Sequence, residues 1–89
     1  MRTVRLVITG RVQGVGYRMW AERAATQLGI RGWVRNRADG AVEGLVAGEA
    51  ADVETFRQFL HQGPPAAGVD RVEWSETSDE AEEGFLVRK

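Results

Sequence analysis

The stretch VRLVITGRVQGVGYRMWAERAATQL, residues 4–28, changes its hydrophobic period once, and this change decides the fold. In residues 4–8 an apolar side chain occupies every second position, which is typical of a β-strand. From Tyr17 onward the apolar positions recur every three or four residues, as they do on one face of a helix. The intervening residues 10–16 contain three glycines. The stretch therefore predicts a strand, a turn-rich loop and a helix that ends before Gly29.

The rest of the chain completes a β-α-β-β-α-β order with a short additional strand at its end. An Asp-Gly turn signal separates two predicted strands, which should form a hairpin. The second helix is marked by Val53, Phe56 and Leu60 and ends at Gln62, before two prolines that cannot continue it. The further predicted strands cover residues 32–36, 41–47, 69–75 and 85–87.

This order predicts an α+β fold, the ferredoxin-like split βαβ sandwich (βαββαβ), with two helices on one face of a mostly antiparallel sheet. A length of 89 residues fits one domain, residues 1–89. There is no cysteine, which excludes disulfides, thiolate metal sites and cysteine nucleophiles. No apolar run approaches the ~20 residues of a membrane span, and the first residues lack a signal-peptide pattern. We therefore expect a cytoplasmic protein.

The net charge of −1 conceals an uneven distribution. Residues 1–37 carry eight arginines and one acid, whereas residues 38–89 carry four basic and twelve acidic groups. One interpretation is that the two halves interleave in space and neutralise each other. The other is that the first half holds a local positive site for a small anion.

The loop GRVQGVGYR, residues 10–18, is the first segment that could form a binding or catalytic site. It leads into a helix N-terminus, where backbone N–H groups lack partners and the helix dipole favours an anion. Glycines allow such a loop to curl into an anion-binding nest, and Arg18 adds a guanidinium that can contact two phosphate oxygens. The residues match neither a Walker loop nor a dinucleotide fingerprint, and Val12 stands where a Cys-x5-Arg phosphatase loop needs its cysteine. A glycine-rich turn with a solvated arginine remains the plainer alternative.

The second segment is GWVRNRADGAVE, residues 32–43. Its plainer interpretation is a hairpin in which Asn36 and Asp39 only stabilise the turn. In the predicted fold, however, the strand that ends at Asn36 runs beside the edge from which Arg18 emerges. An asparagine has both a donor and an acceptor, so it can hold a water molecule without a change of charge.

Together the two segments closely resemble the two signatures of the acylphosphatase family, and the resemblance extends over essentially the whole chain. It implies metal-independent hydrolysis of acyl phosphates to a carboxylate and inorganic phosphate, with direct attack by a positioned water and with no cofactor. It implies that Arg18 binds the phosphoryl group and that Asn36 positions the attacking water. The backbone N–H groups expected to bind phosphate are those of Gln13, Gly14, Val15, Gly16 and Tyr17, together with Arg18. Tyr17 departs from the phenylalanine usual in the family, and the added hydroxyl matters only if it is buried without a partner.

An independent chemical argument favours the same substrate class. A chain without cysteine or an obvious metal cluster can attack only a labile phosphate bond. The carboxylate that leaves an acyl phosphate has a conjugate-acid pKa of about 4–5, so it needs no general acid. Inorganic phosphate is then both product and inhibitor, and we expect a monomer without a nucleic-acid or membrane partner. The alternative from another class is a non-catalytic phosphate- or anion-binding regulatory module. An RNA-recognition domain, which has the same topology, would need an aromatic motif on its central strands, and the third predicted strand of this chain has no aromatic residue.

Overall fold

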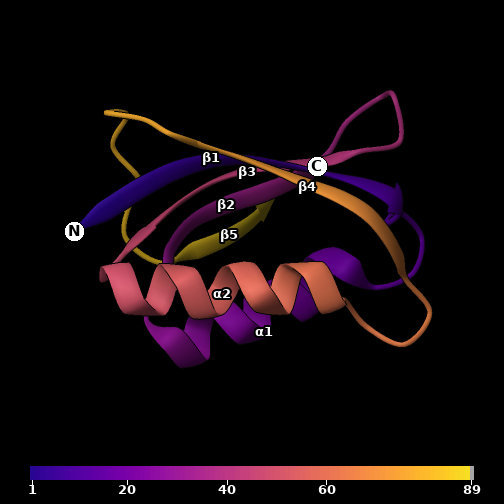
Figure 1. Ribbon diagram of the computed structural model, residues 1–89, viewed down its shortest axis with the longest axis horizontal. Coiled ribbons are helices and arrows are strands. Elements are labelled where there is room, and N and C mark those ends of the chain that lie inside the picture. Colours follow the sequence, from indigo (N-terminus) through magenta and orange to yellow (C-terminus); the bar gives the residue numbers. More distant parts are fainter. Residues whose placement is uncertain (89) are drawn as a thin grey trace.

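Five strands form one sheet, and two helices lie against one of its faces (Figure 1). The computed structural model describes residues 1–88. The elements in chain order are β1 (Arg2–Arg11), α1 (Tyr17–Leu28), β2 (Arg31–Asn36), β3 (Val42–Gly48), α2 (Ala50–Gln62), β4 (Gly68–Glu76) and β5 (Phe85–Arg88). In the part of the chain that the structure describes, neither helix is long and apolar enough to cross a membrane.

The strand order is β4-β1-β3-β2-β5. β1 pairs antiparallel with β3 and β4, β2 pairs antiparallel with β3, and β5 pairs parallel with β2. The predicted α+β architecture, with two helices on a mostly antiparallel sheet, is therefore confirmed. The parallel pairing places the last strand beside the strand that ends at Asn36.

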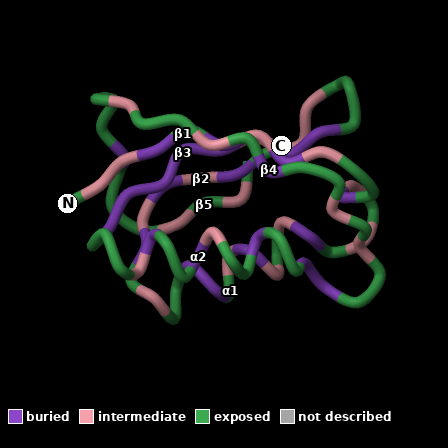
Figure 2. The backbone as a smooth tube through the Cα atoms, viewed as in Figure 1, coloured by how far each residue is buried: buried purple, intermediate pink, exposed green. Residues whose placement is uncertain are grey.

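The core lies between the sheet and the helices, where the buried parts of the tube in Figure 2 face one another. Alternation in β1 directs Val4, Leu6 and Ile8 toward the helices, and each is at most 1% exposed. Phe56 and Leu60 of α2 are fully buried in the same cluster. The two hydrophobic periods in the sequence thus mark the two faces that meet in this core.

One boundary in the sequence prediction is wrong, because β1 continues through Gly10 to Arg11 instead of ending before Gly10. The register of β1 against β4 shifts between Thr9 and Gly10. Gly10 has φ +121°, and a Cβ there would lie 2.2 Å from the carbonyl oxygen of Gly68. This glycine therefore lies in a β-bulge, where it allows β1 and β4 to approach closely, and it is not part of a loop.

The two oppositely charged halves of the chain interleave. Arginines of the first half pair with acids of the second in five contacts: Arg2–Glu54, Arg2–Glu76, Arg5–Asp79, Arg35–Glu43 and Arg37–Asp39. The neutralisation interpretation therefore holds for much of the molecule. Arg18 is an exception, since it makes no salt bridge within residues 1–88.

Candidate active site

The loop before α1 ends in a helix N-terminus that offers free backbone donors. Gly14 and Gly16 have φ of +74° and +79°, the left-handed conformation that glycine adopts without steric cost. Gly16 is the N-cap, and the helix has no side-chain cap and no acidic residue in its first turn. The first N–H groups of the helix therefore lack both a capping oxygen and a competing carboxylate, which leaves them available to an anion.

A cavity of about 170 Å³ lies at this N-terminus. It is large enough for a small tetrahedral anion and water, because one water occupies ~30 Å³ in the liquid. The lining residues are Val12, Gly14, Gly16, Tyr17, Arg18, Met19, Asn36 and Val87. The cavity thus brings together Arg18 and Asn36, which are 18 positions apart in the sequence.

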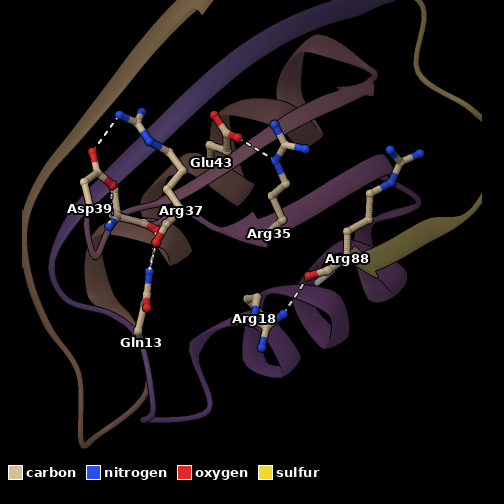
Figure 3. A network of polar contacts seen from close by, with 8 residues as sticks. Gln13, Arg18, Arg35, Arg37, Asp39, Glu43 and Arg88 are labelled. Carbon is tan, nitrogen blue, oxygen red and sulfur yellow. Dashed lines mark hydrogen bonds and ion pairs between the residues drawn. The ribbon is translucent and has the colours of Figure 1, made fainter.

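The guanidinium of Arg18 is held by the backbone of the last strand. Its Nη1 donates a hydrogen bond of 2.6 Å to the carbonyl oxygen of Arg88 (Figure 3). That single bond uses one of five guanidinium donors. The remaining positive charge stands at the helix N-terminus without a carboxylate partner among residues 1–88.

The side chain of Asn36 comes into the cavity from the end of β2. Val34 belongs to the core beneath the helices, and strand alternation puts Asn36 on the same face. Its Oδ1 is buried and has no hydrogen-bond partner within residues 1–88. Leaving such an acceptor unpaired costs about 1–3 kcal/mol, so this oxygen is available to accept a hydrogen bond from a water or ligand in the cavity.

Tyr17 connects the start of α1 to the C-terminal end of α2 through a hydrogen bond. Its ring is 1% exposed, and its hydroxyl donates a hydrogen bond of 2.6 Å to the carbonyl oxygen of Leu60. Burial raises the pKa of this hydroxyl well above its ordinary value. The extra hydroxyl is therefore buried but paired, and it links the start of α1 to α2.

The side chain of Gln13 does not line the cavity, and Val15 is not a lining residue either. The Gln13 carboxamide instead contacts the loop between β2 and β3 (Figure 3). In that loop Asp39 accepts a hydrogen bond from Ala41 N and pairs with Arg37, so it acts as a turn residue. Hydrogen bonding from the Ala41 N–H, aided by the Arg37 charge, lowers the pKa of Asp39.

Sequence reasoning missed the contribution of β5. Val87 lines the cavity and the Arg88 carbonyl holds Arg18, yet nothing in residues 85–88 alone indicates a site. The only available signal was the topology, because a strand parallel to β2 must end near Asn36. Met19 was missed because its apolar side chain, 58% exposed, gives no chemical signature.

The fold and the cavity together define a ferredoxin-like α+β protein with a cavity at the N-terminus of its first helix. The family model described as acylphosphatase matches residues 4–87. The chain belongs to the acylphosphatase family.

Individual relatives agree with this assignment. An acylphosphatase from Azoarcus sp. (strain BH72) is 52% identical over 80 residues, covering 90% of this chain and 82% of its own length. An acylphosphatase from Thermococcus kodakarensis is 49% identical, with 98% of both chains covered. The crystal structure of acylphosphatase from Bacillus subtilis superposes with a TM-score of 0.95 at 32% identity, covering 100% of both chains. Family membership supports acyl phosphate hydrolysis, and the non-catalytic anion-binding module is not favoured.

Proposed function

We propose that this protein hydrolyses the carboxyl–phosphate bond of acyl phosphates in the cavity between the glycine loop and the end of β2. The observation that carries the proposal is the meeting of an unneutralised guanidinium, an uncapped helix N-terminus and an unpaired buried carboxamide oxygen in one cavity. The first two groups suit a phosphoryl dianion, and the third suits a neutral hydrogen-bond donor such as water.

In the proposed complex the backbone N–H groups of Gln13 through Tyr17 and the guanidinium of Arg18 surround the phosphoryl oxygens. These donors are fixed by the fold before the substrate arrives, so they need not reorganise as charge shifts in the transition state. Phosphoryl transfer depends mainly on such positioning and electrostatic stabilisation. Arg18 is therefore the principal phosphate ligand, and the loop completes the cradle.

Asn36 is proposed to hold the attacking water through its Oδ1. The water oxygen attacks phosphorus, the bond from phosphorus to the carboxyl oxygen breaks, and the electron pair leaves with the carboxylate. The water proton passes to a phosphoryl oxygen of the substrate, which gives inorganic phosphate. The leaving carboxylic acid has a pKa of about 4–5, so the carboxylate departs without a general acid.

The same chemistry makes a metal ion unnecessary, and the proposal includes no metal and no cofactor. Within residues 1–88, no three His, Cys, Asp or Glu side chains lie together as a metal-binding group. We expect activity to be unchanged by EDTA. Restoration of activity by an added divalent cation after chelation would contradict this part of the proposal.

Further parts of the proposal concern the protein in solution. We propose that it acts as a cytoplasmic monomer and that inorganic phosphate, as product, competes with the substrate. An overall charge of −1 gives no broad attraction to nucleic acid or to an anionic membrane. Size-exclusion chromatography with light scattering, run with and without phosphate, tests the monomer.

The decisive experiment compares the wild type and Asn36→Ala with benzoyl phosphate as substrate. We expect the wild type to turn over, and Asn36→Ala to lose kcat while it retains the inhibition constant of inorganic phosphate. Gln58→Ala, which removes an exposed carboxamide from α2, is the matched control and should behave as the wild type. Phosphate binding without turnover in the wild type would instead favour the anion-binding module.

A further inference from the structure

Gln13 connects the anion loop to the tip of the β2–β3 hairpin. Its Nε2 donates two hydrogen bonds, of 2.8 Å to the carbonyl oxygen of Arg37 and of 2.9 Å to that of Ala41 (Figure 3). Both bonds are partly buried, and they span 24 and 28 positions of the sequence. The partners are backbone atoms, so what the bonds fix is the position of the hairpin itself.

The hairpin tip is held together by its own contacts. Arg37 N donates to Ala41 O at 2.8 Å, and Gly40 N donates to Arg37 O at 3.3 Å. The Asp39 carboxylate accepts from Ala41 N at 3.1 Å and pairs with the Arg37 guanidinium. Gln13 therefore binds the two carbonyls that close a preformed turn, rather than a loose loop.

These hydrogen bonds lie close in the sequence to the two segments that line the cavity, the glycine loop and the end of β2. Gln13 precedes Gly14, which lines the cavity, and Arg37 directly follows Asn36. We propose that Gln13 is a positioning residue, whose carboxamide sets the separation between the anion loop and the water-holding side chain of Asn36. This inference rests on the proposed function, since it assigns Gln13 a part in the water-attack step only.

A glutamine fits this task for a chemical reason. The carboxamide has two N–H donors on one nitrogen, so a single neutral group can bind two carbonyls. A glutamate of equal length only accepts hydrogen bonds when ionised, and it would also bring negative charge toward the anion site. A lysine or arginine would donate, but its charge would compete with Arg18 for the phosphoryl group.

The test is the kinetics of Gln13→Met, which keeps the length and neutrality of the side chain and removes both donors. A displacement near 1 Å at a reacting group costs up to about 100-fold in rate, so we expect kcat for benzoyl phosphate to fall by about 10- to 100-fold. The KM and the inhibition constant of inorganic phosphate should stay within about twofold, because the anion cradle remains. Gln58→Met on the exposed face of α2 is the matched control and should keep the wild-type kcat.

A double-mutant cycle with Asn36→Ala separates positioning from a general loss of stability. If Gln13 acts through Asn36, Gln13→Met should lower kcat by less than about threefold in the Asn36→Ala background, because coupled residues are not additive. Independent, additive losses would overturn the inference. If Gln13→Met fails to fold by far-UV circular dichroism, Gln13→Asn is used, since it keeps the amide but shortens its reach.

The outcomes separate this inference from the proposed function. A wild-type kcat in a folded Gln13→Met or Gln13→Asn overturns the role of Gln13 and leaves acyl phosphate hydrolysis intact. A parallel loss of kcat and phosphate affinity also overturns it, because that pattern indicates damage to the anion cradle. A wild type without turnover contradicts the proposed function and, with it, this inference.

Discussion

Arg18 differs from the salt-bridged arginines of the N-terminal half in what its guanidinium contacts. Arg2, Arg5, Arg35 and Arg37 each pair with a carboxylate, whereas Arg18 contacts a backbone carbonyl. A carbonyl orients the guanidinium and leaves its full charge for an anion. The arginine that the sequence singled out is therefore one whose charge remains available at a helix N-terminus.

Replacement of Arg18 tests this difference. We expect Arg18→Gln to lower kcat/KM by about 100-fold or more, which corresponds to a loss of ~3 kcal/mol of transition-state stabilisation. Steady-state hydrolysis of benzoyl phosphate measures the effect. Arg23→Gln, which removes an exposed arginine from the same helix, is the control and should retain normal kinetics. Wild-type kinetics in Arg18→Gln would exclude the assigned role.

At Tyr17 the side-chain hydroxyl contributes to the free energy of unfolding. Tyr17→Phe removes the hydroxyl that binds Leu60 O and leaves this carbonyl without that donor. We expect the free energy of unfolding in urea to fall by about 1–2 kcal/mol, with kcat little changed. No change in unfolding free energy would show that the 2.6 Å hydrogen bond contributes nothing.

The same hydroxyl makes stability depend on alkaline pH. Burial raises the folded-state pKa of Tyr17, so above about pH 10 the unfolded chain loses this proton while the folded chain retains it. The folded state then binds more protons, and stability falls as pH rises. Tyr17 is the one tyrosine in the sequence, so Tyr17→Phe should flatten the decline in thermal midpoint above about pH 10.

At the scale of the element, β2 depends on the absence of a side chain at Gly32. This residue has φ +134°, and a Cβ there would lie 1.8 Å from the carbonyl oxygen of Leu45 on β3. We expect Gly32→Ala to cost more than about 3 kcal/mol of unfolding free energy, because backbone on both strands must move. Urea denaturation measures it.

Gly84→Ala is the control for Gly32→Ala. Its φ of +77° is also left-handed, but a Cβ there meets nothing within 4 Å. It should cost only the ~1–2 kcal/mol of a non-glycine residue in that conformation. Equal losses in the two variants would mean that the short contact to β3 is relieved easily.

Most elements could be predicted because their signals are local. The alternation in β1 and the three-to-four spacing in α1 and α2 reflect which face of each element is buried. The end of β1 was misjudged because a glycine at a β-bulge has the same letter as a glycine in a loop. The contacts of the Gln13 side chain could not be predicted either, because its partners are backbone carbonyls, which any residue would supply.

The site itself was predictable only in part. A glycine loop, an arginine in the first helical turn and an asparagine at a strand end indicated an anion site, and Arg18 and Asn36 do line one cavity. Their roles in binding and catalysis stay predictions until the variants are measured. The contribution of Val87 and the Arg88 carbonyl depends on which strands are neighbours, and local sequence does not determine strand order.

At the scale of the whole molecule, opposite charges from the two halves of the chain pair with each other, in some cases between segments far apart in the sequence. Asp79 in the loop after β4 binds Arg5 of β1, and this hydrogen bond and charge lower the pKa of Asp79. The pKa of Asp39 is lowered by the Ala41 N–H and by Arg37. Both carboxylates are exposed, so each pair contributes modestly.

These two groups contribute to the loss of stability at acidic pH. Because their folded-state pKa values lie below the unfolded value near ~3.9, their contribution is present above about pH 4 and is lost as pH falls through the folded values. We expect the thermal midpoint to decline below about pH 4, and less steeply in the double variant Asp39→Asn, Asp79→Asn. An unchanged slope in that variant would assign the decline to other carboxylates.

The hydrogen bond from Arg18 to the Arg88 carbonyl makes the position of this guanidinium depend on the docking of the last strand. β5 is a four-residue strand at the edge of the sheet, and it pairs with β2, which lies far from it in the sequence. Until β5 docks on β2, the Arg18 guanidinium lacks its one hydrogen bond to the backbone within residues 1–88. During refolding, enzymatic activity should therefore return only once β5 has docked on β2.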